Sequence, residues 1–485
     1  MSTYTQLNKN YINGHWVDGL SDRTFDITNP FDEEVLATVK LATLSQVEEA
    51  FDIAHTSYRA WAKDAELRRD VMTKAIAYFE EHREEIIELL IIESGSSFIK
   101  ASVETANTIA VLKEALTMVD RVYEVRTEPS VIPGKINEMH RLPLGVVSSI
   151  APFNFPLYLS MRTIAPALAL GNAVVHKADL QVSLASGSVI AKAFEEAGIP
   201  AGVFQSILTK SSIIGDVMVE HPVVRLVSFT GSTEVGRRIG NIAGGLFKRV
   251  ALELGGNGPF VVLADADVDQ AVKAAVFGKF LHQGQICMIT NRMIVHENLY
   301  DEFVEKFVEH VKRIPCGDPR DHKVIIGPII NNQQVKKIEE IINKAKAENT
   351  EILLEGKVVG NVITPTIFGN VSNDSDLAQN EIFGPVAPII KASSDEEAIR
   401  FANDTIYGLS SAIFSGNEEK AREYALEIEF GMTHINDQTV NDETRAAFGG
   451  MRQSGVGRFG NPWIVDEFTD TKWISVQKVP REYPF

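Results

Sequence analysis

The chain has 485 residues, of which 45% are hydrophobic and 23% charged, the composition of an ordinary globular protein. A chain of this length exceeds what one hydrophobic core supports, so we expect two or three domains. Its net charge is −18, from 47 Lys and Arg against 65 Asp and Glu, which disfavours nonspecific binding to nucleic acid or to anionic membranes.

The N-terminal quarter of the chain predicts paired strands followed by helices. Asn13-Gly14 lies between two short apolar runs, a pattern that predicts a β-hairpin. From Thr43 to about Met118 the pattern is helical, with an apolar stripe at helical spacing from Arg68 to Ile92, and the charged run 80–85 is typical of a solvated helix face. The polar N-terminus does not resemble a signal peptide, because it lacks an apolar core.

Residues 121–147 differ in character from the helical segment before them. They are rich in β-forming residues and broken by three prolines, which predicts an excursion from the first domain. The uncharged stretch 142–161 that overlaps them is long enough to cross a bilayer. It contains three prolines and Asn154, which break helices and need polar partners, so we do not expect a membrane span.

Strand-like and helix-like segments then alternate in two successive blocks. This alternation predicts an α/β fold with two doubly wound, Rossmann-like parallel sheets. The first block has expected strands at 145–150, 172–176, 204–207 and 223–229, and helices at 165–170 and 183–197. The second block has expected strands at 259–263, 291–296, 387–391, 411–414 and 434–436, and helices at 268–280, 300–313 and 329–347. Residues 468–476 predict an edge strand, whose partner a neighbouring subunit can supply.

Two features of the first block are candidate ligand sites. Residues 228–236, SFTGSTEVG, follow a strand and open a helix, an arrangement that binds phosphate. Gly231 and Gly236 do not have GxGxxG spacing, so the usual dinucleotide fingerprint is absent and a simple connection is an equal alternative. Lys177 follows the strand 172–176, at the end where doubly wound sheets bind ligands. It either binds a ribose or phosphate or is an exposed lysine at a strand end.

Three residues carry functional groups suited to attack on a carbonyl carbon. Cys287 supplies a thiol nucleophile, Glu253 a general base and Asn154 an oxyanion donor. A buried cysteine is more often an inert small hydrophobe, so none of the three is decisive alone. Cys287 and Cys316 are too few for a disulfide framework, which predicts a reducing cytoplasm, and no clustered His/Cys pattern predicts a metal site.

Eight segments together resemble the NAD(P)-dependent aldehyde dehydrogenase superfamily. They occur in the family's order, cover nearly the whole chain, and are highly specific in combination. The segments are FNFP (153–156), GNAVVHK (171–177), FTGSTEVG (229–236), LELGGN (252–257), GQIC (284–287), GDP (317–319), EIFGPV (381–386) and FGGMRQSGVGR (448–458).

The resemblance implies a role for each candidate residue. Cys287 is the nucleophile, Glu253 is the general base, and the Asn154 side chain and the Cys287 backbone N–H form the oxyanion hole. The implied reaction oxidises an aldehyde to a carboxylic acid through a thiohemiacetal and a thioester, which Glu253 hydrolyses by activating water. The implied cofactor, NAD or NADP, contacts Lys177 and Asp179 at the adenosine ribose, Gly231, Ser232 and Gly236 at the pyrophosphate, and Glu381 and Phe383 at the nicotinamide end.

The same resemblance implies the division of the chain into domains. Residues 1–122 and 146–254 form a cofactor-binding domain, and residues 255–465 form a catalytic domain. Residues 123–145 and 466–485 form a small oligomerisation element, which implies a homodimer or homotetramer.

Three positions depart from the family pattern. Many members carry a glutamate three residues after the cofactor lysine, whereas this chain has Leu180 there and an acid one position earlier, Asp179. The preference between NAD and NADP therefore stays open. A lysine and a glutamate that belong to proposed proton routes are replaced by Thr163 and Phe459, so the path of the Glu253 proton also stays open.

The substrate class follows from a narrower resemblance. Residues 434–442, the sequence around Asn154 and the Lys177-Ala-Asp179 segment resemble benzaldehyde, vanillin and salicylaldehyde dehydrogenases, which implies an aromatic aldehyde. Tyr158 and Arg162 fall one and two turns into the helix after Asn154, so both can face a substrate tunnel. Arg162 is either a donor to a phenolic oxygen or a structural arginine paired with an acid.

Other functions account for parts of this pattern. An aliphatic semialdehyde dehydrogenase belongs to the same class of enzyme. A cofactor-independent thiol esterase leaves the phosphate turn, Lys177 and Glu381 without a role. A non-catalytic homologue has no need to keep Cys287, Glu253 and Asn154 together, and Glu253 as a hydrolytic base argues against transfer of the acyl group to coenzyme A.

Overall fold

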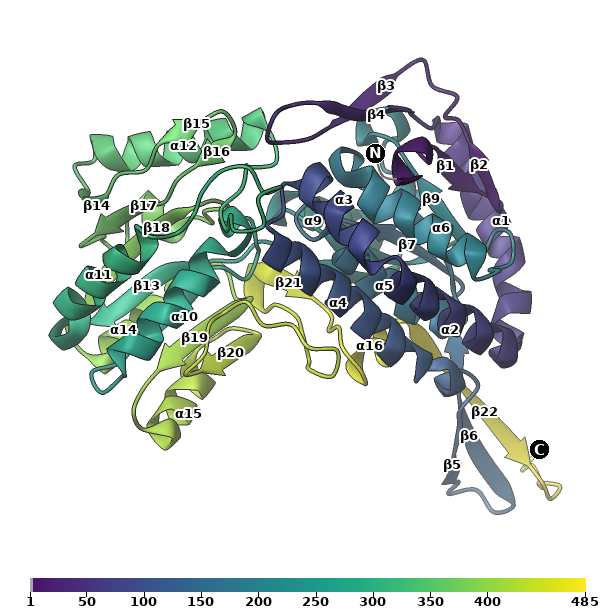
Figure 1. Ribbon diagram of the computed structural model, residues 1–485. Helices are drawn as coiled ribbons and strands as arrows, with labels where there is room; N and C mark the ends of the chain where they lie inside the picture. Colours follow the sequence, from purple (N-terminus) through teal and green to yellow (C-terminus); the bar gives the residue numbers. More distant parts are fainter. Residues whose placement is uncertain (1–2) are drawn as a thin grey trace.

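The computed structural model describes residues 3–485, which form two α/β units and one small projecting sheet (Figure 1). The predicted α/β class with parallel sheets is confirmed. Within the described residues, no helix combines the length and the apolar character that crossing a membrane requires.

The first unit is built on an eight-stranded sheet with the order β2-β1-β9-β8-β7-β10-β11-β21. The five strands from β9 to β11 are parallel, and β1 and β21 run antiparallel to their neighbours. The chain lays down β7, β8 and β9 in one direction and then places β10 on the other side of β7, so a ligand crevice is expected between β7 and β10. The strands are β1 (Asn10–Ile12), β2 (His15–Val17), β7 (Val146–Ile150), β8 (Ala173–Lys177), β9 (Phe204–Ile207), β10 (Val224–Thr230), β11 (Arg249–Glu253) and β21 (Gly455–Val456).

Helices cover both faces of the first sheet. Because successive side chains of a strand point to opposite faces, Val147 and Val174 join one core with helices α2 to α6, whereas Val146 and Val175 join another with α1 and α7 to α9. All four valines are fully buried. The helices are α1 (Leu44–Lys63), α2 (Ala65–Glu81), α3 (Arg83–Ser94), α4 (Phe98–Leu116), α5 (Pro156–Ala169), α6 (Val189–Glu196), α7 (Ser211–Ile214), α8 (Val217–Glu220) and α9 (Thr233–Gly245).

The second unit is built on a seven-stranded sheet with the order β14-β17-β18-β13-β12-β19-β20. Only β14 is antiparallel, and the strands β12, β13 and β19 are buried along their whole length, as expected for a sheet covered on both faces. The strands are β12 (Gly258–Val262), β13 (Thr290–His296), β14 (Glu351–Leu354), β17 (Thr366–Gly369), β18 (Val386–Ala392), β19 (Ser410–Phe414) and β20 (Met432–Ile435). The helices are α10 (Val268–Phe280), α11 (Glu297–Val311), α12 (Asn332–Ala347), α13 (Asp376–Gln379), α14 (Asp395–Asn403) and α15 (Glu418–Glu427).

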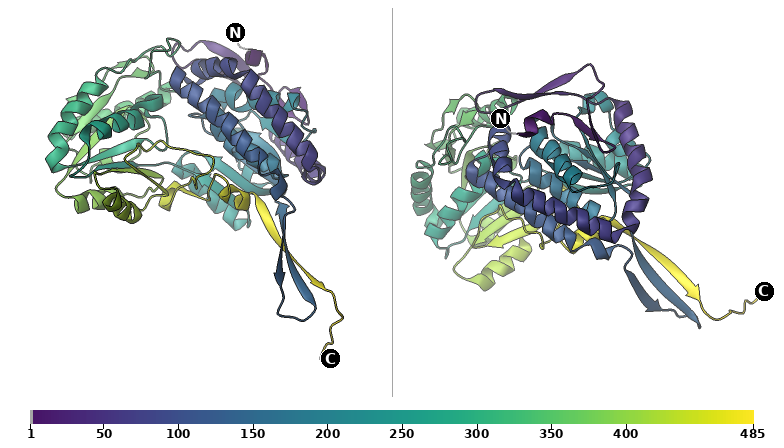
Figure 2. Two further views of the ribbon diagram at one scale, coloured as in Figure 1. Left: turned by 60° about the horizontal axis from the view of Figure 1, so that its bottom comes forward. Right: turned by 45° about the vertical axis from the view of Figure 1, so that its right-hand side comes forward.

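A three-stranded sheet projects from the first unit, with the C-terminus near its tip (Figure 2). Its order is β22-β6-β5, from β5 (Val125–Pro129), β6 (Lys135–Pro143) and β22 (Thr469–Gln477), and the short helix α16 (Trp463–Glu467) precedes β22. The edge strand expected at 468–476 finds its partner within the chain, since β22 pairs with β6 along its whole length. The other edge of β22 pairs with no strand among the described residues.

The predicted elements are mostly present, with informative differences. The hairpin at Asn13-Gly14 is confirmed by the pairing of Ile12 with His15. The helix expected at 329–347 begins only at Asn332, because the Asn331 side chain caps it by accepting a hydrogen bond from the Gln334 N–H. Paired strands were expected in the first 50 residues, and the hairpin of β3 (Thr24–Thr28) with β4 (Val35–Lys40) lies there. The hairpin of β15 (Val358–Val359) with β16 (Val362–Ile363) was not predicted. Also not predicted were β11, β14, β17, β21, α7, α8 and α13 to α16.

Candidate functional site

One cleft of about 840 Å³ collects residues from both α/β units. Nine of the twelve residues that the sequence singled out line it, and they come from positions more than two hundred residues apart in the chain. These nine residues are Asn154, Lys177, Asp179, Gly231, Ser232, Glu253, Cys287, Glu381 and Phe383. Gly236 lies just beyond, buried in the first turn of α9. Tyr158 and Arg162 do not line this cleft.

The first unit contributes the carboxyl ends of its strands to the cleft. Lys177 and Glu253 are the last residues of β8 and β11, and Gly231 directly follows β10. Asn154 lies four residues beyond β7, just before helix α5. These positions are the crevice at which doubly wound sheets bind ligands, on both sides of the reversal of strand order.

The second unit contributes residues that precede its strands. Cys287 lies three residues before β13, and Glu381 and Phe383 lie just before β18. The loop before Cys287 has positive φ at His282, Gln283 and Gly284, which folds it tightly against the loop before β18. A Cβ atom at Gly284 would lie 2.4 Å from the carbonyl oxygen of Gly384, so only glycine permits this approach.

Two glycines join the two sides of the cleft. Gly255 and Gly256 follow Glu253, and the Gly256 N–H donates to Oε1 of Glu381 at 2.9 Å. A Cβ atom at Gly255 would lie 2.7 Å from Oε2 of Glu381, and one at Gly256 would lie 2.3 Å from the Cys287 carbonyl oxygen. The segment after Glu253 therefore packs directly against Glu381 and Cys287.

The Glu253 carboxyl group is buried without a partner. It is 1% exposed, and neither of its oxygens has a hydrogen-bond partner among the described residues. Burial raises the pKa of Glu253 to about 8, although the charge of Arg162 lowers it. A carboxyl group with a pKa near neutrality is suited to taking and releasing protons.

Cys287 is half-buried, and its thiol is also perturbed. Burial and the charge of Glu253 raise the pKa of the Cys287 thiol to about 12, so the thiol carries its proton at neutral pH until a base removes it. Its backbone N–H has no hydrogen-bond partner among the residues that the structure describes. The group is therefore free to donate to a developing negative charge.

The Asn154 carboxamide is fixed from the side of the cysteine loop. Its Nδ2 donates to the carbonyl oxygen of Gln285 at 2.9 Å, two residues before Cys287. A carboxamide nitrogen carries two N–H groups, so the second remains available to a ligand. The side chain is 3% exposed, which holds this donor in a dry environment.

The opposite end of the cleft has groups that fit a dinucleotide. Ser232 is exposed and caps helix α9, whose N-terminus opens onto the cleft. Gly236 packs so closely on Leu254 that a Cβ atom would lie 2.1 Å from it. The Lys177 ammonium has no ion pair or hydrogen bond within residues 3–485, and burial lowers its pKa while Asp179 raises it. A free ammonium and a helix N-terminus suit phosphate and ribose, and the Glu381 carboxylate suits a second ribose.

Tyr158 and Arg162 lie behind the cleft, around a small cavity of about 10 Å³ that they share with Asp442. Arg162 Nη1 lies 3.0 Å from Oδ2 of Asp442, and its guanidinium lies over the rings of Phe448 and Phe459 at 4.2 and 4.6 Å. A buried guanidinium needs a carboxylate partner, and Asp442 supplies it, as expected if the role of Arg162 is structural. Asp442 belongs to the segment 434–442, and its pairing with Arg162 was not predicted.

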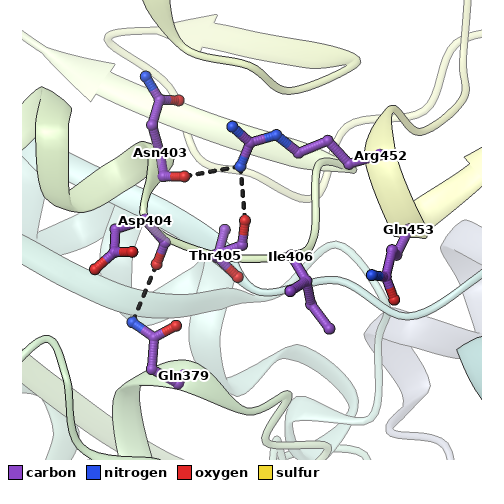
Figure 3. Close-up of a pocket in the computed structure, with 7 residues that line it drawn as sticks. All are labelled: Gln379, Asn403, Asp404, Thr405, Ile406, Arg452 and Gln453. Carbon is purple, nitrogen blue, oxygen red and sulfur yellow. Dashed lines mark hydrogen bonds between the residues drawn. The ribbon is translucent and has the colours of Figure 1, made fainter.

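A second hollow, of about 520 Å³, lies on the surface near the loop before β21 (Figure 3). Arg452, its only cation, donates through Nη1 to the backbone carbonyls of Asn403 and Thr405. Its Nη2 pairs with Glu429. With that cation committed to the protein, the other charged group of the hollow is the Asp404 carboxylate, whose Oδ2 accepts from Asn373 at 2.8 Å. In the described part of the chain, no group of three or more His, Cys, Asp and Glu side chains is arranged to hold a metal ion.

Comparison with known proteins gives a consistent match over the whole chain. The model of the aldehyde dehydrogenase family matches residues 16–474. A vanillin dehydrogenase from Corynebacterium glutamicum is 47% identical over 473 residues, 97% of this chain and 98% of that protein. A crystal structure of an NAD-dependent benzaldehyde dehydrogenase from the same species superposes with a TM-score of 0.90 at 44% identity, covering 99% and 98% of the two chains. A salicylaldehyde dehydrogenase from Pseudomonas putida G7, in complex with salicylaldehyde, has a TM-score of 0.94 at 35% identity, with 98% and 99% covered.

Proposed function

From the premise that this chain belongs to the aldehyde dehydrogenase family, we propose that it oxidises an aromatic aldehyde to the carboxylic acid with NAD. The family membership expected from the sequence motifs is confirmed, and with it the class of enzyme. The observation that carries the finer proposal is the convergence of Cys287, Glu253 and Asn154 in one cleft with a dinucleotide-compatible end.

The first chemical step is attack of the Cys287 sulfur on the aldehyde carbonyl carbon. Because the pKa of this thiol is raised to about 12, its proton must pass to a base in the solvent before attack. The carbonyl oxygen becomes an oxyanion, which the free N–H of Asn154 and the backbone N–H of Cys287 stabilise. Each such donor contributes about 3 kcal/mol to the transition state.

When bound, NAD would supply the hydride acceptor for oxidation of the Cys287 thiohemiacetal to the thioester. The residues that we propose to hold it are Lys177 and Asp179 at the outer ribose, Gly231, Ser232 and Gly236 at the phosphates, Glu381 at the inner ribose, and Phe383. Phe383 makes an edge-to-face contact with Phe153, with ring centroids 5.8 Å apart, which fixes its ring next to the catalytic loop.

Hydrolysis of the thioester then needs a second base step. Glu253 takes a proton from water, and the water oxygen attacks the acyl carbon while the Cys287 sulfur leaves as a thiolate that regains a proton. The proton that Glu253 holds must return to solvent before the next cycle. The Thr163 and Ser228 hydroxyls form a hydrogen bond of 2.8 Å. Neither group is charged, so we assign no residue to the path of the Glu253 proton.

Three observations support an aromatic substrate and NAD. Relatives at 35% to 47% identity are named for vanillin, benzaldehyde and salicylaldehyde. Phe153 and Phe383 give the cleft aromatic walls. Asp179 lies in the cleft beside Lys177, where its charge repels a 2′-phosphate, and the benzaldehyde relative is NAD-dependent. We propose that Tyr158 and Arg162 support the wall behind the substrate, since Arg162 is already paired with Asp442.

We further propose that the protein forms a homo-oligomer, that its chain divides into three parts, and that it works in the cytoplasm. The free edge of β22 and the projecting sheet suit association into a homodimer or homotetramer. We take residues 1–122 and 146–254 as the cofactor-binding domain, 255–465 as the catalytic domain, and 123–145 with 466–485 as the oligomerisation element. Two unpaired cysteines suit the cytoplasm.

Formation of reduced cofactor tests the function directly. We expect the highest kcat/KM with benzaldehyde, vanillin or salicylaldehyde and NAD, and lower values with a short aliphatic aldehyde or with NADP. Faster turnover of the aliphatic aldehyde would remove the aromatic assignment and favour a semialdehyde dehydrogenase. Cofactor-free ester hydrolysis as the main activity would favour a thiol esterase.

A further inference from the structure

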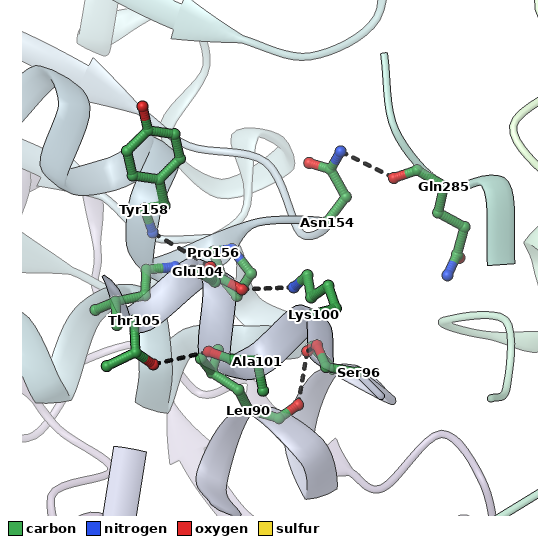
Figure 4. Close-up of polar contacts among 12 residues, drawn as sticks. Leu90, Ser96, Lys100, Ala101, Glu104, Thr105, Asn154, Pro156, Tyr158 and Gln285 are labelled. Atoms are coloured by element: carbon green, nitrogen blue, oxygen red, sulfur yellow. Dashed lines mark hydrogen bonds and ion pairs between the residues drawn. The ribbon is translucent and has the colours of Figure 1, made fainter. Parts of the chain in front are cut away.

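A buried ion pair lies beside the catalytic loop and takes no part in the mechanism above. Lys100 and Glu104 are one turn apart on helix α4, their side chains are 0% exposed, and Nζ of Lys100 lies 2.5 Å from Oε2 of Glu104 (Figure 4). Replacement of a buried ion pair by apolar residues of similar size is often neutral or stabilising. The need for a stable core therefore does not explain why these two charges are here.

Glu104 holds the first turn of helix α5. This helix begins at Pro156, which has no N–H, and its N-cap residue is Phe155, whose side chain cannot accept a hydrogen bond. Oε1 of Glu104 accepts from the N–H groups of Leu157 and Tyr158 at 2.9 and 3.2 Å. A carboxylate from another helix thus does what a Ser, Thr or Asp at the N-cap usually does, and its charge suits the positive end of α5.

Lys100 holds Phe155, the residue between Asn154 and the first turn of α5. Its ammonium lies 4.4 Å from the ring centroid of Phe155, so the ring is clamped between a cation and the body of the protein. Glu104 and Lys100 together restrain three of the four residues that follow Asn154. On its other side, the Asn154 carboxamide is fixed by Gln285, in the loop that leads to Cys287.

We propose that Lys100 and Glu104 are positioning residues that hold the Asn154 carboxamide where the oxyanion develops. This inference rests on the reaction proposed above, because it assigns Asn154 to the oxyanion. Neither residue touches the substrate, and both act through the backbone of residues 155–158. A displacement of about 1 Å at a catalytic group costs on the order of 100-fold in rate, so a small loss of restraint has a measurable effect.

The test uses the full-length enzyme with two reactions that share the oxyanion. One is oxidation of the best aldehyde of the panel, and the other is hydrolysis of 4-nitrophenyl acetate without cofactor. We expect Glu104→Ala to lower kcat in both reactions about 10- to 100-fold, with little change in KM. Glu104→Gln, which keeps an oxygen for the N–H groups of α5, should restore kcat to within about threefold of wild type.

A double-mutant cycle with Asn154→Ala separates positioning from general damage. If Glu104 acts through Asn154, Glu104→Ala lowers kcat no further once Asn154 is gone. An equal loss in both backgrounds, or a loss below twofold in the single variant, would overturn the proposal. Should Glu104→Ala not fold, Lys100→Met keeps the Glu104 oxygen and should give a three- to tenfold loss that likewise vanishes beside Asn154→Ala.

A matched control exists in Glu93. Its carboxylate is also fully buried and accepts from two helix N–H groups, those of Leu184 and Ala185, at 2.7 and 2.8 Å, which belong to the helical turn Leu184–Ser188 and not to α5. Glu93→Ala should lose thermal stability as Glu104→Ala does and keep its kcat at saturating cofactor. If Glu93→Ala lost as much kcat as Glu104→Ala, the loss in Glu104→Ala would be explained by lower stability and not by positioning.

Hydrogen exchange tests the positioning without any substrate. The N–H groups of Leu157 and Tyr158 should exchange at least about tenfold faster in Glu104→Ala. Unchanged exchange there would contradict the positioning, even if the enzyme acts on no aldehyde of the panel. Conversely, faster exchange in a protein without aldehyde oxidation would contradict the proposed function alone.

Discussion

The two ends of the cleft differ in how much water reaches their functional groups. At the catalytic end, Glu253 and Asn154 are almost completely buried, and burial raises the pKa of both Glu253 and Cys287. At the cofactor end, Ser232 is exposed, whereas Lys177 is half-buried, as Cys287 is, and burial lowers its pKa. We call the part around Asn154, Glu253 and Cys287 the dry end, and the part around Lys177 and Ser232 the wet end. Electrostatic interactions are stronger where water is excluded, so we assign the chemistry to the dry end and reversible binding to the wet end. Changes at the dry end should alter kcat, and changes at the wet end should alter KM.

The largest expected effect is loss of the nucleophile. Cys287→Ala should lower aldehyde oxidation by at least about 10⁴-fold, because no other group at the dry end can form the thioester. Cys316→Ala is the matched control, since Cys316 is a partly buried thiol outside the cleft and should leave kcat unchanged. Steady-state rates of the two purified variants decide this point, and substantial activity in Cys287→Ala would remove the covalent mechanism.

Glu253→Gln should have the next largest effect. We expect kcat to fall about 10²- to 10⁴-fold, because water is no longer activated to hydrolyse the thioester. Rapid mixing should still show formation of reduced cofactor up to one equivalent of active sites, because hydride transfer precedes the hydrolysis that needs Glu253. Steady-state turnover near the wild-type rate would show that Glu253 is not the base.

Arg162→Met tests whether Arg162 has a structural role or contacts the substrate. It leaves the buried Asp442 carboxylate without a cation and with the Tyr158 hydroxyl as its hydrogen-bond partner, so the free energy of unfolding should fall by about 3 kcal/mol. The kcat/KM values for benzaldehyde and for its hydroxylated derivatives should fall by the same factor. A loss confined to the hydroxylated aldehydes would instead place Arg162 in contact with the phenolic oxygen.

At the wet end, Lys177→Met should weaken cofactor binding. We expect the KM for NAD to rise about 10- to 100-fold, the range for a lost hydrogen bond to a charged group, while kcat changes less than about threefold. Kinetics at varied NAD and saturating aldehyde measure both constants. A large fall in kcat with unchanged KM would break the division of the cleft into a binding end and a chemical end.

The smallest expected effect is a pH dependence of stability. The unfolded chain releases the Glu253 proton near 4.5, whereas the folded protein holds it up to about pH 8. Between these values the folded state carries the extra proton, so its stability falls as pH rises, by at most about 1.4 kcal/mol per pH unit from this group. The melting temperature of wild type should therefore fall more steeply than that of Glu253→Gln from pH 6 to pH 8. Parallel curves would show that the carboxyl group is not held protonated.

Which site residues could be predicted depended on whether they follow or precede a strand. The rule that ligands bind at carboxyl ends of parallel strands located Lys177 and Gly231. Cys287 and Glu381 precede their strands, so no topological rule pointed to them. The thiol chemistry of Cys287 made it a candidate, and only the resemblance of its segment to a family pointed to Glu381. The fold class followed from the alternation of segments. Helix α14 was missed because nine residues give only a short periodic pattern, and β17 because its four residues are all buried and do not alternate.

The contacts that fix the catalytic residues were not accessible from sequence. Lys100 and Glu104 have the spacing of a surface ion pair on a helix, and only the packing of α4 on α5 shows that they are buried. Arg162 and Asp442 are 280 residues apart, so their pairing is a property of the folded chain. Gly255 and Gly256 leave room for Glu381 and for the Cys287 carbonyl, and this close packing is likewise visible only in the folded chain.

The central claim is that Cys287 carries the acyl group of the aldehyde at the dry end. The most direct test is intact-protein and peptide mass spectrometry of Glu253→Gln after incubation with NAD and benzaldehyde. We predict one benzoyl group per chain, located on Cys287, and none when NAD is omitted. An unmodified Cys287 in a variant that has reduced one equivalent of NAD, or a benzoyl group on another residue, would contradict the account.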